Sequence, residues 1–141
     1  MITAKTWELS NVLTVTVKSS EKCPVYLLFT SKKGQQYGKA VRHICMFPQT
    51  WTGLKKLEPV LVESDWEETP VEVSWSLPSF WQVEVREFKE NKYVCFSQWE
   101  GETRIPKFNM TIEEHRVLLE ISGEIDAVIK DMRAERQALS N

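Results

Sequence analysis

Residues 25–34, VYLLFTSKKG, and residues 92–101, KYVCFSQWEG, repeat one pattern within a single short chain. Each copy has tyrosine at its second position, phenylalanine at its fifth and glycine at its tenth. Each copy is also followed by a basic loop, a short strand-like stretch and a helix-like run, in the same order. An internal repeat accounts for both the matching positions and the matching order.

An alternating stretch stands before each copy. Residues 12–18, VLTVTVK, and residues 80–86, FWQVEVR, alternate apolar with polar side chains and contain many β-branched residues, which predicts half-buried strands. A charged turn separates each stretch from the copy that follows, so each half is predicted to open with a β-hairpin. Residues 39–46 and 105–110 supply further extended segments.

A helix is predicted at the end of each half. Thr111 and Glu114 have the spacing of a capping box, and an apolar stripe with helical spacing follows them. The stripe consists of Val117, Leu118, Ile121, Ile125, Val128, Ile129 and Met132. In the first half Pro48 suits the first position of a helix whose stripe includes Trp51. Pro59 lacks an amide donor, so this helix is predicted to end or kink near Glu58.

The chain is therefore predicted to be an α+β protein made of two ββββα-like repeats with antiparallel sheets. Residues 1–64 form the first repeat, residues 65–78 the connector and residues 79–141 the second repeat. Within the connector, VEVSW alternates well enough to add an edge strand. A unit of about 60 residues buries too little surface to be stable alone, so the two helices are expected to pack together in an internal pseudo-dimer.

Composition limits the class of protein. Apolar residues make up 42% of the 141 residues, enough for a real core. No stretch approaches the roughly 20 apolar residues of a membrane span, and no signal peptide is visible, so we expect an intracellular protein of the nucleus or cytoplasm. Cys23, Cys45 and Cys95 have no CxxC spacing, which favours reduced, packed thiols over disulfides or a zinc site.

The charge is unevenly distributed. A net charge of −2 argues against a generic polyanion binder. The stretch from residue 18 to residue 42 is basic, however, with Glu21 as its one acid, while the last predicted helix is acidic. The basic residues of that stretch are Lys18, Lys22, Lys32, Lys33, Lys39 and Arg42.

Catalysis finds little support in the residues. His43 and His115 are the only histidines, and neither stands in a nucleophile or metal-ligand motif. Glycine-rich phosphate-binding motifs are also absent from the sequence. We therefore expect a protein that is not an enzyme, with no catalytic residues, no cofactor and no metal site.

Residues 85–132 resemble the C-terminal domain of the transcriptional coactivator called positive cofactor four. The features that carry the resemblance lie in order along the second half. They are Arg86-Glu87-Phe88-Lys89, Trp99, Gly101-Glu102 with Arg104, Pro106 and Lys107, and Ile125-Asp126-Ala127-Val128. In the first half, MFPQTWTGLKKL (residues 46–57) resembles the family's helix opening. The plant Whirly proteins are similar in carrying two such units in one chain.

The resemblance implies binding of single-stranded DNA, with RNA or melted duplex as alternatives, in transcription, replication, recombination or repair. It implies that Phe88 and Trp99 stack on bases, and that Arg86, Lys89, Lys92, Arg104 and Lys107 contact the nucleic acid. The first repeat would contribute phosphate contacts from Lys18, Lys32, Lys33, Lys39 and Arg42. Partners would be the nucleic acid and transcription or replication proteins, with no membrane, and the chain would be a monomeric pseudo-dimer or a homo-oligomer.

A second interpretation stands beside this one. Five acids in the second repeat, Glu84, Glu87, Glu90, Glu100 and Glu102, equal its basic residues in number between residues 79 and 109. Such neutrality favours a protein-interaction module that kept the fold and lost nucleic-acid binding. Its partner surface would then be the acidic last helix and the tryptophans Trp66 and Trp75.

Overall fold

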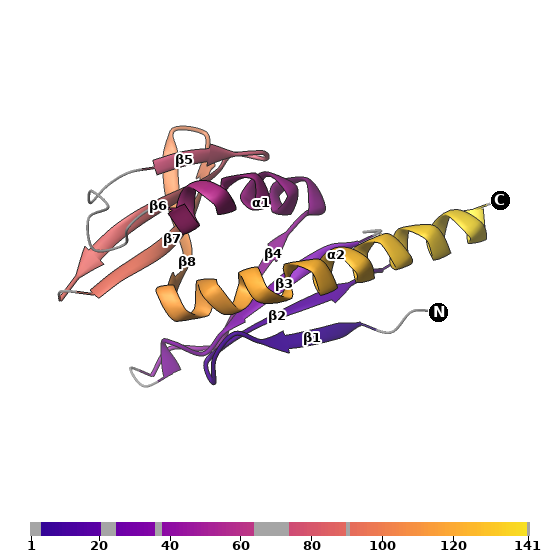
Figure 1. Cartoon of the computed structure of the whole chain (residues 1–141). Helices are drawn as coiled ribbons and strands as arrows, with labels where there is room; N and C mark the ends of the chain where they lie inside the picture. The colour runs from indigo at the N-terminus through magenta and orange to yellow at the C-terminus, as the bar shows by residue number, and fades with distance from the viewer. Residues whose placement is uncertain (1–3, 21–24, 36–37, 64–73, 90, 141) are drawn as a thin grey trace. The chain divides into compact units, whose positions relative to one another are not determined.

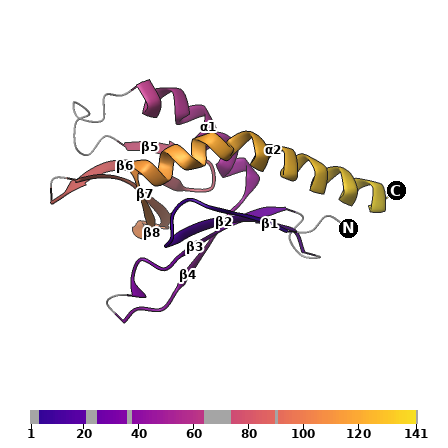
Figure 2. The same cartoon turned by 60° about the horizontal axis from the view of Figure 1, so that its bottom comes forward.

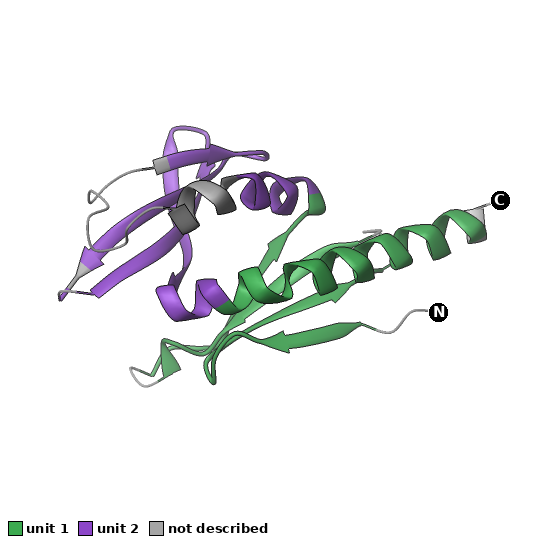
Figure 3. Ribbon diagram, viewed as in Figure 1, with its two compact units in different colours: residues 1–48, 117–141 green, residues 49–116 purple. Residues whose placement is uncertain are grey.

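In the residues that the structure describes, the protein has an α+β fold with two antiparallel four-stranded sheets and two helices, and the α+β class agrees with the sequence prediction. The computed structural model describes residues 4–20, 25–35, 38–63, 74–89 and 91–140, without the side chains of residues 57–63, 74, 88, 139 and 140. Cys23, Trp66 and most of the expected connector lie outside the described residues. The chain divides into two compact units, residues 1–48 with 117–141 and residues 49–116 (Figure 3).

Unit 1 contains the first sheet, whose strands lie in chain order (Figures 1 and 2). The strands are β1 (Lys5–Glu8), β2 (Leu13–Lys18), β3 (Tyr26–Ser31) and β4 (Arg42–Met46). The sheet is accompanied by the helix α2 (Ile112–Ser140) from residue 117 onward. Buried side chains come from one face of the strands and from the predicted stripe of α2, where Leu118, Ile125, Ile129 and Met132 are all buried. Near the end of α2, Nη1 of Arg136 donates a hydrogen bond to the carbonyl oxygen of Ser20 at 2.7 Å.

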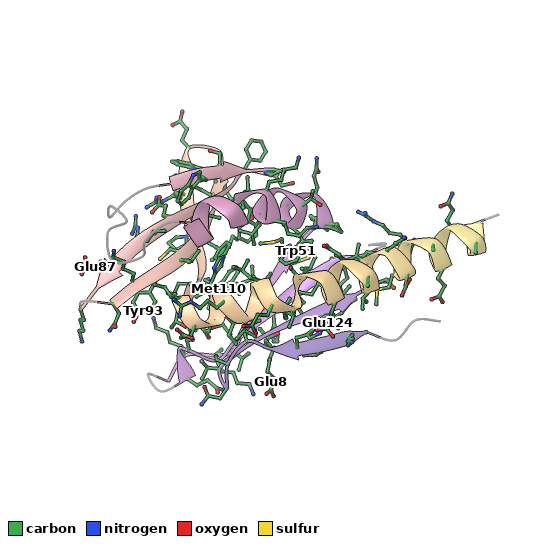
Figure 4. All side chains as sticks on the ribbon, viewed as in Figure 1. Glu8, Trp51, Glu87, Tyr93, Met110 and Glu124 are labelled. Atoms are coloured by element: carbon green, nitrogen blue, oxygen red, sulfur yellow. The ribbon has the colours of Figure 1, made fainter. Side chains whose placement is uncertain are left out.

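Unit 2 contains the second sheet, again in chain order, together with the helix α1 (Pro48–Glu63). Its strands are β5 (Ser74–Leu77), β6 (Trp81–Phe88), β7 (Asn91–Glu100) and β8 (Thr103–Thr111). Phe96 and Phe108 stack with ring centroids 4.5 Å apart on the buried face of this sheet. Trp51 of α1 and Met110 of β8 are almost fully buried in the same unit (Figure 4).

Each sheet therefore shares a unit with the helix from the other half of the sequence. α1 follows β4 along the chain, but residues 49–63 belong with β5–β8. α2 follows β8, but its residues from 117 onward belong with β1–β4. Each sheet therefore has exposed positions on one face and buried positions on the other. The buried face shares its unit with a helix from the other half of the sequence.

The helix starts follow the predictions, and α1 does not end near Glu58, so a kink at Pro59 stays the prediction there. The Thr111 amide donates to Oε1 of Glu114 at 2.8 Å, and the Glu114 amide donates to Oγ1 of Thr111 at 3.1 Å, which completes the capping box. α1 begins at Pro48 as expected, yet it continues beyond Glu58. Pro59 removes one hydrogen bond of the ladder, and the helix continues on both sides of that missing bond.

Strand β1 was not predicted from the sequence. Only four residues long, it consists mostly of exposed polar side chains, so it lacks the alternation that predicted β2 and β6. It adds to the sheet through pairing with β2, in which Thr6 lies opposite Thr16 and their hydroxyl oxygens are 2.8 Å apart. Strand β5 lies partly where the edge strand was expected.

His115 lies in the first turns of α2 and is buried, with 1% of its surface exposed. Burial removes solvent from the charged imidazolium and lowers the pKa of His115 from 6.5 to about 4. Between pH 6.5 and about pH 4, His115 is protonated in the unfolded chain and neutral in the folded protein. Stability should therefore fall as the pH drops through this interval.

We expect the free energy of unfolding to decrease by about 2 kcal/mol between pH 7.5 and pH 5 from this residue alone, approaching about 3 kcal/mol below pH 4. Urea unfolding at each pH measures the change. His115→Gln should reduce this pH dependence, whereas His43→Gln, at an exposed position, should retain it. Equal pH dependence in the His115→Gln variant and the wild type would contradict the assignment.

Candidate nucleic-acid interface

The candidate interface lies on the face of the second sheet opposite its buried core. Val83 and Val85 of β6 point into the core, so the alternate residues of β6 and their partners on β7 and β8 share the other face. We call this surface the outer face of unit 2. It is formed by Gln82, Glu84, Arg86, Tyr93, Cys95, Ser97, Trp99 and Arg104.

Trp99 is the large apolar side chain of this outer face, with 41% of its surface exposed. Its indole Nε1 donates a hydrogen bond to Oε1 of Gln82 at 2.8 Å. Arg104 lies directly opposite Trp99 on β8. The hydrogen bond restrains the indole while leaving much of the ring accessible, as a base-stacking surface requires.

Glu84 connects the two arginines of the outer face. Its side chain is almost buried, and its Oε2 accepts a hydrogen bond from Nε of Arg86 at 2.7 Å. Its Oε1 accepts a hydrogen bond from Nη1 of Arg104. Two predicted contacts to nucleic acid are thus held by one carboxylate, and the three groups together carry a single positive charge. This cluster was missed because its members lie on two strands separated by β7.

The turn formed by residues 78–80, between β5 and β6, has an unusual backbone. Ser79 has φ 63° and Phe80 has φ 65°, the left-handed region that L-residues other than Gly, Asn and Asp rarely adopt. Such conformations cost roughly 1–3 kcal/mol each. Phe80 is nevertheless 75% exposed.

Hydrogen bonds hold all three carbonyl groups of this turn. The Pro78 carbonyl oxygen accepts from Oγ1 of Thr50 at 3.0 Å. The Ser79 oxygen accepts from Nε2 of Gln98 at 3.0 Å, and the Phe80 oxygen accepts from the amide of Trp99 at 2.9 Å. The strained backbone is therefore fixed by a helix on one side and by β7 on the other.

Gly53 allows α1 to approach this turn closely. A Cβ atom at residue 53 would lie 2.6 Å from Cδ of Pro78, which is closer than two carbon atoms can approach. Glycine is unfavourable inside a helix, but here no larger residue fits without moving the proline ring. The helix and the 78–80 turn are consequently in direct contact.

The two aromatic platforms expected from the resemblance lie far apart. Phe88 pairs with Asn91 at the start of β7, whereas Trp99 is near its end, so about eight residues or roughly 26 Å of strand separate them. The side chain of Phe88 lies outside the described residues. Lys89 and Lys92 lie at the Phe88 end, as do Glu87 and Tyr93 in Figure 4.

Lys107 is the remaining predicted contact of the second sheet. Its Nζ lies 3.9 Å from Oε1 of Glu100, at the limit of an ion pair, and the carboxylate is mostly exposed. Such a pair contributes little to stability. Three cationic contacts predicted for unit 2 thus lie close to carboxylates: Arg86 and Arg104 at Glu84, and Lys107 near Glu100. This agrees with the balanced charge of that part of the sequence.

In unit 1, four predicted phosphate contacts gather at one end of the sheet. We call them the cationic turn: Lys32, Lys33, Lys39 and Arg42, from the β3–β4 connection and the first residue of β4. The Lys39 amide donates to the Gly34 carbonyl at 3.0 Å, which closes this turn. No acid occurs between residues 31 and 42. Lys18 lies at the opposite end of β2, roughly 17 Å of strand away.

The exposed face of the first sheet differs from that of the second. It carries threonines, such as Thr30, whose Oγ1 lies 3.2 Å from Nδ1 of His43. Cys45 is exposed on this face, so its prediction as a packed thiol is wrong: it occupies an outward position between the buried Ile44 and Met46. The described strands of this sheet carry none of the exposed large apolar side chains, which are Phe47, Phe80 and Trp99.

Among the described residues, no three His, Cys, Asp or Glu side chains are grouped so that they could hold a metal ion. Within the same part of the chain, no helix has the length and apolar character needed to cross a membrane. No protein-family model, curated protein or solved structure matches the sequence or its fold.

Glu84→Gln tests the arginine cluster. The amide keeps the shape of the carboxylate but loses its charge, so two charge-assisted hydrogen bonds are weakened and one amide hydrogen faces a guanidinium. We expect the free energy of unfolding to fall by about 1–3 kcal/mol, measured by urea denaturation. Glu87→Gln on the same strand, at an exposed position, should change it by less than about 0.5 kcal/mol. Equal effects of the two substitutions would contradict a special role for Glu84.

Proposed function

We propose that this protein binds single-stranded nucleic acid, with DNA as the principal ligand and little dependence on sequence. In this proposal, bases stack on Trp99 while lysine and arginine side chains contact phosphate. The observation that carries the proposal is an exposed tryptophan, restrained by Gln82 and next to Arg104, on the open face of an antiparallel sheet. Aromatic faces beside cationic groups are what sequence-tolerant binding of single strands requires.

We also propose that the chain is an internal pseudo-dimer of two related halves, similar to the positive cofactor four and Whirly families. Equivalent strand registers support this proposal. Phe29 pairs with Val15 as Phe96 pairs with Val83, and in each pair both side chains are buried. The methionine at the end of each half's last core strand is fully buried in both cases, as Met46 and Met110. The exchange of helices between the units is what a dimer fused into one chain would retain.

The cationic turn supports a division of work between the units. Lys32, Lys33, Lys39 and Arg42 stand in a segment without acids, whereas the arginines of the outer face of unit 2 share Glu84. Unit 1 would therefore supply most of the phosphate contacts, and unit 2 would supply the stacking surface. Holding melted strands in this way would serve transcription, replication, recombination or repair.

A protein-interaction module is the second candidate. The Glu84 cluster favours it, because a carboxylate that already holds Arg86 and Arg104 competes with phosphate for them. Trp75, one of the tryptophans expected on its partner surface, is half-buried and lies opposite Val83 on the core side of the sheet. Binding to an oligonucleotide at low salt distinguishes the two candidates.

Trp99→Ala tests the stacking surface. Fluorescence anisotropy with a labelled thymidine oligonucleotide of about 20 nucleotides should show a Kd about 5- to 150-fold higher, corresponding to 1–3 kcal/mol for one stacked base. The slope of log Kd against log salt should stay unchanged, because no phosphate contact is removed. Phe47→Ala removes an aromatic ring of similar exposure from unit 1 and should bind like the wild type. Wild-type protein that is folded but does not bind at low salt would overturn the proposal.

Lys32→Ala/Lys33→Ala tests the cationic turn. Each lost phosphate contact lowers the salt slope for single strands by about 0.7, so the double variant should bind more weakly and with a slope lower by about 1.4. Lys56→Ala/Lys130→Ala removes the same charge from exposed positions on the two helices and serves as the control. Identical slopes for the two double variants would show that only overall charge matters.

A further inference from the structure

We propose that Phe80, displayed by the strained 78–80 turn, is a second base-stacking platform beside Trp99. This inference rests on the proposed function, because it assigns a ligand contact to the same outer face. Phe80 was predicted only as the first residue of a strand. In the structure its left-handed backbone, with φ 65°, takes it out of the strand alternation, and β6 begins at the next residue, Trp81.

Phe80, Trp99 and Arg104 form a row across the sheet. Trp81 pairs with Gln98, and the Trp99 amide donates to the Phe80 oxygen at 2.9 Å, so Phe80 lies opposite Trp99 in the same register. On the other side of Trp99, Arg104 is its partner on β8. Opposed residues of antiparallel strands have Cα atoms about 4.5–5.5 Å apart, so two aromatic rings originate within reach of consecutive bases.

The stability of the fold does not explain a phenylalanine at this position. The backbone has φ 65°, which glycine or asparagine adopts more easily, and the ring is 75% exposed instead of filling the core. The turn is nevertheless held at all three of its carbonyl oxygens. Strained backbone conformations that are held in place by their surroundings are typical of ligand-binding sites. This turn also exposes a large apolar ring to solvent, as a ligand contact would require.

The neighbours of the ring favour a base as its occupant. Phe80 and Trp99 are the exposed large apolar side chains of the described part of unit 2, and the polar side chains of Gln82 and Arg104 adjoin Trp99. An apolar peptide would offer no further hydrogen bonds to these polar groups. Unstacked nucleotides offer a flat base to each ring, polar base edges to the Gln82 amide, and a phosphate to Arg104.

Phe80→Asn separates the ligand role from a structural role. Asparagine tolerates the left-handed backbone, so the urea midpoint should stay equal or rise, while the Kd for the thymidine oligonucleotide should rise at least about five-fold. Phe80→Leu keeps apolar bulk without an aromatic face and should weaken binding similarly. Ser79→Asn relieves the neighbouring strained residue but retains the ring, so it should bind within about two-fold of the wild type.

The outcomes distinguish this inference from the proposed function. Loss of affinity in both Phe80 variants, with wild-type affinity in Ser79→Asn, supports the platform. Phe80→Asn or Phe80→Leu with wild-type affinity, alongside a weakened Trp99→Ala, overturns the Phe80 assignment and leaves the proposed function standing. Wild-type protein that does not bind the oligonucleotide overturns both. Weakened binding in Ser79→Asn as well as Phe80→Asn assigns the effect to the turn backbone and overturns the platform.

Discussion

The structure depends on the burial of one face of each sheet beneath a helix supplied by the other half of the chain. A four-stranded sheet with a single apolar face is unstable in water until that face is covered. Residues 49–63 belong with β5–β8, and α2 from residue 117 onward belongs with β1–β4, so neither half of the sequence contains a complete core.

Within each unit, covering one face of the sheet leaves the other face outside the core of that unit. Strand alternation assigns Val83 and Val85 to the core, and it assigns Gln82, Glu84 and Arg86 to the outer face. Exposing a large aromatic side chain to water on the outer face is unfavourable. Such a residue therefore indicates a binding role more strongly than an exposed polar residue does. Rigid strands, the capping box at Thr111 and the contact of Gly53 with Pro78 hold these outer positions in place.

Sequence reasoning predicted what depends on local pattern. Alternation predicted strands β2 and β6 and an edge strand that overlaps β5, and the capping box and Pro48 marked where both helices begin. It could not predict what depends on long-range register. Phe88 and Trp99 look close in sequence, but they lie at opposite ends of the β6–β7 pair, and Glu84 meets Arg104 across an intervening strand. Phe80 was hidden for a different reason, since its left-handed φ takes it out of the strand alternation from which side-chain directions are read.

The charge distribution decides what kind of nucleic-acid binding this fold could support. Glu84 neutralises one of the two arginines on the outer face of unit 2, so counterion release there is small. Stacking on exposed rings does not depend on salt in this way. A surface that combines aromatic rings with nearly balanced charge would therefore bind single strands, whose bases are accessible, in preference to duplex, whose bases are stacked inside. The net charge of −2 is compatible with such selectivity, because it suppresses the non-specific attraction to phosphate that a basic protein would have.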